Sequence, residues 1–143
     1  MTANKNNLRV LVVDDNRDAA DSLAMLVKLW GHVVEIGYDG TAVNRVPEFK
    51  PDVVLLDIGL PKLDGNKFAQ QIRQSPESQS TLVIAVTGFH DEARKQLSQA
   101  AGIDHYLIKP VDPGVLKKLL LIKLLEKNSA TSSPADVAIE RTP

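Results

Sequence analysis

Apolar runs of strand length alternate with longer amphipathic stretches along residues 8–127 of the chain. The runs are rich in Val, Ile and Leu, which is typical of strands buried on both faces. The longer stretches repeat apolar residues at three- and four-residue spacing, as helices with one buried face do. We therefore expect five strands at 8–13, 33–37, 52–57, 81–87 and 104–108, and five helices at 17–30, 40–48, 65–74, 90–101 and 113–126. Because helical crossovers connect parallel strands, this order predicts a doubly wound α/β fold, (βα)5, with a five-stranded parallel sheet and helices on both faces.

The two ends of the chain differ in composition from the alternating part. Residues 1–7 are polar, and residues 128–143 are mostly small and polar, without the apolar spacing that would offset the entropy of ordering them. A chain of 143 residues is long enough for one sizeable core and too short for two. We expect a polar leader at 1–7, one folded domain at 8–127 and a flexible tail at 128–143. Residues 137–139 (VAI) leave open a short tail motif that folds on a partner.

Charge and cysteine content exclude several classes of function. The 17 Lys and Arg residues balance 18 Asp and Glu residues, which leaves a formal net charge of -1 and no basic excess to attract DNA. The chain has no cysteine, so it forms neither disulfides nor thiolate metal sites. No apolar run approaches the ~20 residues that span a bilayer, and the N-terminus lacks the pattern of a signal peptide. We expect a cytoplasmic protein that makes no direct contact with DNA or a membrane.

Charged side chains stand where three of the apolar runs end. Asp14 and Asp15 follow the first run, Asp57 closes the third, and Lys109 follows the fifth. Because parallel strands end at one edge of a sheet, these side chains should converge there. Clustered carboxylates repel one another unless a cation is present, and a hard divalent ion such as Mg²⁺ is the natural occupant. For Asp14 or Asp15 taken singly, the alternative is a cap at the start of the first helix.

Thr87 and Lys109 add hydrogen-bond donors at the same edge. Thr87 ends the fourth run before Gly88, so its hydroxyl can donate to a ligand that the glycine allows to approach. Taken alone, Thr87 is better explained as an ordinary strand residue. Lys109, followed by Pro110, can bind a carboxylate when the site is empty and a phosphoryl oxygen when it is filled; the alternative is an exposed lysine at a loop. Together, the strand ends predict a site for a divalent cation and a phosphoryl group.

Four segments resemble the receiver domain of two-component response regulators: VVDDN, LLDIGLPKLDG, VTG and YLIKP. The resemblance covers about residues 8–126, and it is particularly close to receivers attached to hybrid histidine kinases. It implies a flavodoxin-like receiver fold with strand order 2-1-3-4-5. It further implies that Asp57 is the phosphoacceptor and that Asp14, Asp15 and the backbone carbonyl of Gly59 hold Mg²⁺ together with it.

The same resemblance assigns roles to residues around the phosphoacceptor. Thr87 and Lys109 would bind the phosphoryl oxygens. Tyr106 would act with Thr87 as a switch, turning inward when the threonine moves. Gly59 and Phe89 would modulate the lifetime of the phosphoryl group. Because Gly59 has no side chain to position a water and Phe89 can shield the site, we expect a slow-to-moderate loss of phosphate.

The resemblance also implies partners. The phosphodonor would be a sensor histidine kinase or a histidine phosphotransfer protein, and the signal would pass to a downstream protein or onward as a phosphoryl group. No enzyme activity is expected beyond autocatalysed phosphorylation and dephosphorylation, because only about 16 residues follow the fifth helix. A homodimer through the fourth helix, fifth strand and fifth helix stays open, as do a module derived from a hybrid kinase and a phosphorylation-independent interaction module.

Two functions from other classes fit the sequence less well. A flavodoxin-type electron carrier needs a Ser-, Thr- or Gly-rich phosphate loop where DDNRD stands. A metal-dependent phosphatase would have an acid in place of Gly59. The histidines have no second ligand at suitable spacing, so we expect structural roles for His32 and His90 and a surface position for His105. The fifth helix is leucine-rich over more than one face, and such excess apolar surface predicts a partner or a second copy.

Overall fold

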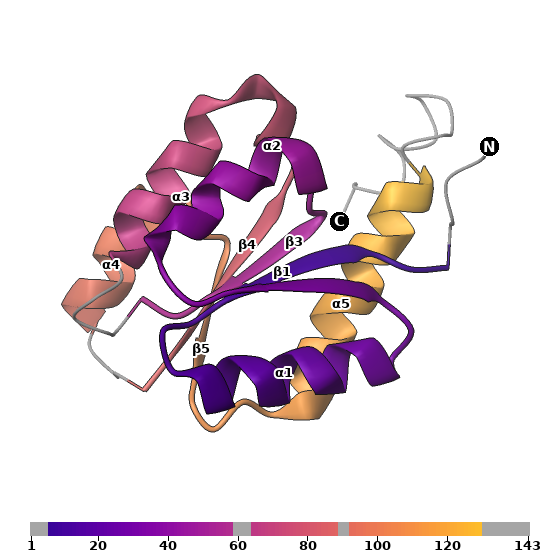
Figure 1. Ribbon diagram of the computed structural model, residues 1–143. Coiled ribbons are helices and arrows are strands. Elements are labelled where there is room, and N and C mark those ends of the chain that lie inside the picture. The colour runs from indigo at the N-terminus through magenta and orange to yellow at the C-terminus, as the bar shows by residue number, and fades with distance from the viewer. Residues whose placement is uncertain (1–5, 59–63, 89–91, 130–143) are drawn as a thin grey trace, which may run out of the picture.

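The fold is built around a parallel sheet with strand order β2-β1-β3-β4-β5. The computed structural model describes residues 6–58, 64–88 and 92–129. Its strands are β1 (Arg9–Val13), β2 (Val33–Gly37), β3 (Val53–Leu56), β4 (Leu82–Thr87) and β5 (His105–Ile108). Each expected strand is present to within one residue at either end, and the doubly wound α/β fold is confirmed (Figure 1).

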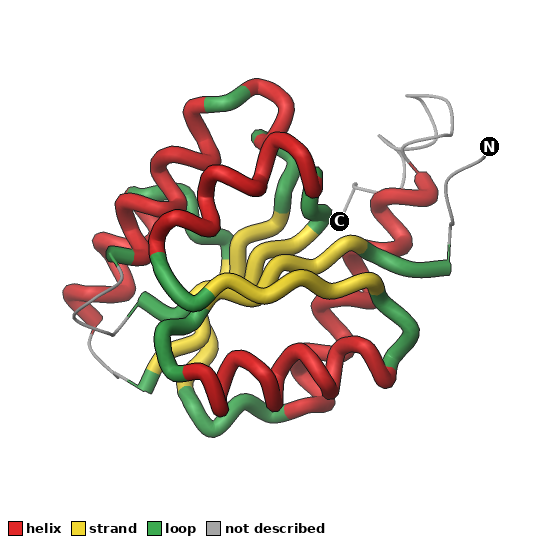
Figure 2. Tube along the Cα trace, viewed as in Figure 1, coloured by secondary structure: helices red, strands yellow, loops and turns green. Residues whose placement is uncertain are grey.

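Helices cover both faces of the sheet (Figures 1 and 2). They are α1 (Arg17–Leu29), α2 (Val46–Phe49), α3 (Gly65–Gln74), α4 (Glu92–Ala100) and α5 (Pro113–Ser129), with short 3-10 helices at Gly40–Arg45 and Pro76–Ser78. The side chains of α1 and α5 pack on one face, and those of α2 and α3 on the other. Helix α5 runs past its expected end at residue 126 and includes the first two residues of the expected tail.

The segment expected as one helix at 40–48 is split in two. Gly40–Arg45 forms a 3-10 helix, and α2 follows it directly. Pro47 has no N–H to donate to the carbonyl four residues earlier, so an α-helix that begins at residue 40 cannot continue regularly through it. The backbone of Lys50 then turns to a left-handed conformation, with φ of 53°, and ends α2. The expectation of a continuous helix was therefore wrong in its detail.

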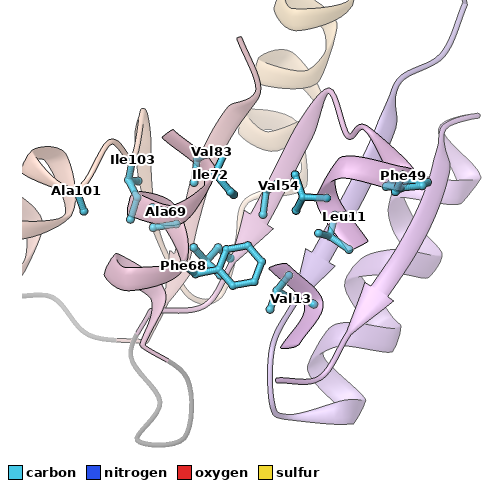
Figure 3. Close-up of a cluster of buried hydrophobic side chains, with 14 residues drawn as sticks. Leu11, Val13, Phe49, Val54, Phe68, Ala69, Ile72, Val83, Ala101 and Ile103 are labelled. Carbon is cyan, nitrogen blue, oxygen red and sulfur yellow. The ribbon is translucent and has the colours of Figure 1, made fainter. Parts of the chain in front are cut away.

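Alternate residues along each strand fill two separate cores. On β1, Leu11 and Val13 face α2 and α3, whereas Val10 and Val12 face α1 and α5. Phe68 of α3 packs in the first of these cores (Figure 3). Because both faces of the central strands are buried, a shift of one residue would move every side chain to the wrong core. The burial of both faces thereby fixes the pairing register, which aligns the carboxyl ends of the strands at one edge of the sheet.

Candidate functional site

The carboxyl ends of three strands bring charged side chains together. Asp14, Asp57 and Lys109 each stand directly after the last residue of β1, β3 and β5 respectively. Backbone hydrogen bonds extend the sheet past these ends: the Asp57 N–H donates to the Val13 carbonyl at 3.0 Å, and the Lys109 N–H donates to the Thr87 carbonyl at 2.7 Å. The convergence predicted from the positions of the apolar runs is therefore confirmed for these three residues.

The Lys109 ammonium contacts both carboxylates. Its Nζ donates to Oδ2 of Asp57 at 2.8 Å and to Oδ2 of Asp14 at 3.0 Å. Asp14 and Asp57 are only 5% and 3% exposed, so the ammonium takes the place of water as a partner for these oxygens. Burial lowers the pKa of Lys109, but the hydrogen bonds and charges of Asp57 and Asp14 raise it by more, and the net pKa lies above the ordinary value. The site thus holds one positive and two negative charges in close contact.

The chain bends after β1, and the two adjacent aspartates there have different surroundings. Oδ1 of Asp14 accepts a hydrogen bond from the backbone N–H of Asn16 at 2.9 Å, and Asp15 is half-buried beside it. The cap of α1 is Asn16, whose side chain accepts from the Ala19 N–H at 3.0 Å. The alternative that Asp14 or Asp15 caps this helix is therefore wrong. Asn16 was missed, although an Asn before an amphipathic stretch is itself a cap signal.

Thr87 and Tyr106 lie on neighbouring strands. Thr87 is fully buried at the end of β4. Tyr106 lies opposite Ala85 in the β4–β5 pairing and packs half-buried against the core that α2 and α3 cover. It also lines a cavity of about 350 Å³ between α4, β5 and α5. The other two residues expected to tune the site, Gly59 and Phe89, lie outside the described residues.

The histidines that the structure describes have no part in the site. His32 Nδ1 accepts a hydrogen bond from the Leu8 N–H at 2.9 Å, which is the structural role expected for it. Burial lowers the pKa of His32, and the nearby charge of Asp52 raises it by less, so the net shift is downward. His105 is exposed, as expected. His90 lies outside the described residues.

The donor atoms of the site suit a hard divalent cation. Asp14 and Asp57 present carboxylate oxygens that already share one cation, the Lys109 ammonium. Within residues 6–58, 64–88 and 92–129, no three Asp, Glu, His or Cys side chains are grouped so that they could hold a metal ion by themselves. The expected backbone ligand, the Gly59 carbonyl, lies outside those ranges. The described residues thus provide part of an oxygen site rather than a full coordination sphere.

Comparison with known sequences decides the family. The family model described as the response regulator receiver domain matches residues 10–121. The chain belongs to this family. The receiver is 37% identical over 115 residues to Protein PilH of Pseudomonas aeruginosa, a match that covers 78% of the chain and 93% of PilH. It is 33% identical over 135 residues to Response regulator MprA of a Mycobacterium species, strain KMS, covering 92% of the chain and 56% of MprA. The chain thus spans about half the length of MprA.

Solved structures agree with this assignment. A CheY-like response regulator receiver domain protein from Methanospirillum hungatei matches with a TM-score of 0.77 and 28% identity, over 85% of the chain and 97% of that protein. A BeF3-activated DrrB receiver domain matches with a TM-score of 0.71 and 26% identity, over 83% of the chain and 97% of that domain. The receiver fold implied by the sequence motifs is therefore confirmed. In the part of the chain that the structure describes, no helix has the length and apolar character to cross a bilayer.

Proposed function

We propose that this receiver accepts a phosphoryl group on Asp57 from a phosphohistidine and passes the signal to another protein. The observation that carries the proposal is the contact of Lys109 Nζ with the buried carboxylates of Asp57 and Asp14 at 2.8 and 3.0 Å. An ammonium in this position neutralises part of the negative charge around the acceptor. It is also placed to meet the oxygens of an incoming phosphoryl group.

The transfer exchanges one bond to phosphorus for another. A carboxylate oxygen of Asp57 attacks the phosphorus while the bond from phosphorus to the donor imidazole nitrogen breaks, and that nitrogen keeps the electron pair. Asp57 becomes an acyl phosphate. Lys109 donates to one phosphoryl oxygen, and the hydroxyl of Thr87 donates to another. Such a reaction requires positioning and charge neutralisation, and little acid-base catalysis.

Mg²⁺ is the proposed cofactor, because receiver domains generally bind it at their phosphorylation site. Asp14, Asp15 and Asp57, together with the carbonyl of Gly59, would hold the ion. It supplies positive charge against the phosphoryl oxygens when it is bound. The contact of the Asp14 and Asp57 carboxylates with one cation, the Lys109 ammonium, supports this assignment.

Phosphorylation adds about two negative charges, and Thr87 and Lys109 are the groups that meet them. The N–H of Lys109 already donates to the carbonyl of Thr87, so the ends of β4 and β5 are linked. We propose that a shift of Thr87 toward the phosphoryl group lets Tyr106 turn inward. That change would alter the surface of α4, β5 and α5, on which Leu97 and Val115 are exposed by 62% and 45%. This surface is the proposed contact for a downstream protein or for a homodimer.

The proposed partners are those of the family. Receiver domains interact with kinases or phosphotransfer proteins, and this one would receive its phosphoryl group from a sensor histidine kinase or a histidine phosphotransfer protein in the cytoplasm. Its output would be protein binding or onward phosphotransfer, as a free-standing receiver or as one derived from a hybrid kinase. Direct DNA binding and a separate enzyme activity are not part of the proposal.

Intact-protein mass after incubation with Mg²⁺ and acetyl phosphate tests the proposal. The native chain should gain one phosphoryl group, about 80 Da, and the Asp57→Asn variant should gain none. Asp52→Asn is a matched control, because Asp52 precedes β3 and pairs with Lys127 at 3.0 Å, away from the site; it should be labelled normally. If the native chain gains no mass from acetyl phosphate or from phosphorylated kinases and phosphotransfer proteins, the proposal fails in favour of a phosphorylation-independent interaction module.

The phosphate lifetime is a separate part of the proposal. With Gly59 and Phe89 at the two modulating positions, the loss rate should be slow to moderate. The double variant Gly59→Asn, Phe89→Ala would offer a side chain to position water and remove the shield. Its acyl phosphate should decay faster than that of the native chain when mass is followed over time, and an unchanged decay would contradict the assigned roles.

A further inference from the structure

The outward side of α5 carries apolar residues that the domain leaves uncovered. Leu121, Ile122 and Leu125 are exposed by 53%, 44% and 57%, whereas Leu120 is buried in the core. At 100° per residue, the three exposed side chains surround Lys118 on the side of the helix that faces away from the sheet. We term Leu121, Ile122 and Leu125 the outer α5 patch.

The outer α5 patch differs from the groove between α4 and α5. Val115 and Leu119 line that groove, which is the cavity of about 350 Å³ next to Tyr106. Leu119 and Leu121 are two positions apart, so their side chains leave the helix in directions that differ by about 160°. Ile122, seven positions after Val115, leaves the helix on nearly the same side as Val115. A protein bound to the surface of α4, β5 and α5 would therefore leave Leu121 and Leu125 of the patch exposed.

The small size of the patch limits what can occupy it. A stable interface between separate proteins buries about 800 Å² on each partner, which is more than three partly exposed side chains provide. A segment tethered to the domain needs far less contact area, because a short linker holds it at an effective concentration in the millimolar range. The chain continues directly from the end of α5 and therefore carries such a tether.

We propose that residues 135–140 of the same chain, ADVAIE, pack on the outer α5 patch. Val137 and Ile139 are the two large apolar residues that follow Ser129, and in an extended segment they point to the same side. Asp136 and Glu140 flank them with negative charge, which complements the exposed Lys118 that the patch residues surround. The segment thus matches the patch in apolar character and in charge.

The segment can reach the patch. Eight residues from Ser129 to Val137 span up to about 28 Å when extended. The return from Ser129 to Leu121 along the helix also covers eight residues, but only about 12 Å at 1.5 Å each. The extended length of the segment exceeds the distance along the helix by about a factor of two, so some residues remain for a reversal of chain direction. Ser133 and Pro134 form a dipeptide that favours such a turn.

Paramagnetic broadening of amide NMR signals tests the contact. The chain has no cysteine, so Ala138→Cys introduces a single site for a nitroxide label and keeps both large apolar residues of the segment. The amide signals of the outer α5 patch should lose intensity in the labelled chain. In the same labelled chain with Val137→Asp and Ile139→Asp, those signals should recover. None of these substitutions falls in the folded domain, so loss of folding does not complicate the comparison.

A charge-matched control separates docking from mere proximity. The labelled chain with Thr131→Asp and Thr142→Asp carries the same added charge but keeps the apolar pair, and it should stay broadened. Equal broadening in all three labelled chains would show that the tether alone brings the label near, and would overturn the proposal. No broadening in the first chain would overturn it as well. Broadening in a mixture of labelled chain and unlabelled ¹⁵N chain would assign the contact to a second copy instead.

Discussion

Loss of the Arg73 guanidinium should destabilise the folded domain by about 3 kcal/mol. Arg73 lies near the end of α3 and joins the loop before β4 to the turn before β5, at the edge of the sheet opposite the site. Its five N–H groups make six contacts of 2.7–3.5 Å with acceptor oxygens, so one N–H of Nη1 is shared between two acceptors, and two of the contacts go to the same carbonyl. The acceptors are the carbonyls of Ser78, Gln79, Thr81 and Gly102 and the carboxylate of Asp104.

The size of this destabilisation follows from the hydrogen bonds of Arg73 that water cannot easily replace. The contact with Ser78 is 3.5 Å long and weak, and the one with Gln79 is exposed. Two bonds to Gly102 and one to Thr81 are partly buried and charge-assisted, and after allowance for solvent each contributes about 1 kcal/mol. The ion pair with Asp104, whose side chain is 40% exposed, adds at most about 1 kcal/mol.

Equilibrium unfolding in urea measures this cost. Arg73→Met keeps much of the apolar stem and removes every donor, and a loss of about 3 kcal/mol would lower the urea midpoint by roughly 1–2 M. Arg73→Lys keeps the charge but not the planar fork, so it should fall between native and Arg73→Met. Asp104→Asn removes the negative charge but keeps an amide oxygen that can accept from the N–H of Val83, as Asp104 Oδ2 does at 2.8 Å, so it should cost less than about 1 kcal/mol. If Arg73→Met stays within about 1 kcal/mol of native, or Asp104→Asn costs as much, the carbonyl contacts are not what stabilises these loops.

Three further predictions concern a histidine, a glycine and the site lysine. The pKa of His32 is lowered in the folded state, so the unfolded chain binds more protons at low pH and the unfolding free energy should fall as pH drops below about 6.5. The variant His32→Asn should lack that part of the pH dependence when urea titrations at pH 7.5 and 5.5 are compared. If the native chain and the variant lose the same unfolding free energy between these pH values, the assignment is refuted. Gly65→Ala would place its Cβ in overlap with Ile58 Cγ2 and 2.8 Å from Ile58 Cα, so it should cost about 1–3 kcal/mol and lower the melting temperature. An unchanged melting curve would show that α3 shifts freely. The raised pKa of Lys109 means that its charge stabilises the fold below the unfolded pKa of about 10.5 and that this contribution is lost as pH rises through the higher folded value. The difference in unfolding free energy between native and Lys109→Met should therefore shrink above pH 10.5, and a constant difference would indicate lost packing instead.

Local sequence patterns were sufficient to predict secondary structure where one kind of structure was strongly favoured. All five runs form strands because short segments rich in aliphatic and β-branched residues are stable mainly when they pair in a sheet. The segment at 40–48 was less determined, because its apolar spacing favours a helix while Pro47 interrupts the helical hydrogen bonds. The alternative that Asp14 or Asp15 caps α1 stayed open because Asp and Asn both cap helices, and only the backbone path shows that Asn16 is the residue that meets the Ala19 N–H.

The sequence by itself determined the order of the elements and the edge at which the charged residues meet. Both depend on the periodicity of neighbouring residues and on the rule that parallel strands share one polarity. Only the tertiary structure decided which groups touch there. Lys109 reaches Asp57 and Asp14 across 52 and 95 residues of chain, and these contacts depend on the packing of both cores, which sets how far each strand end projects. Side-chain geometry across such separations is a property of the whole packed sheet, and no local pattern contains it.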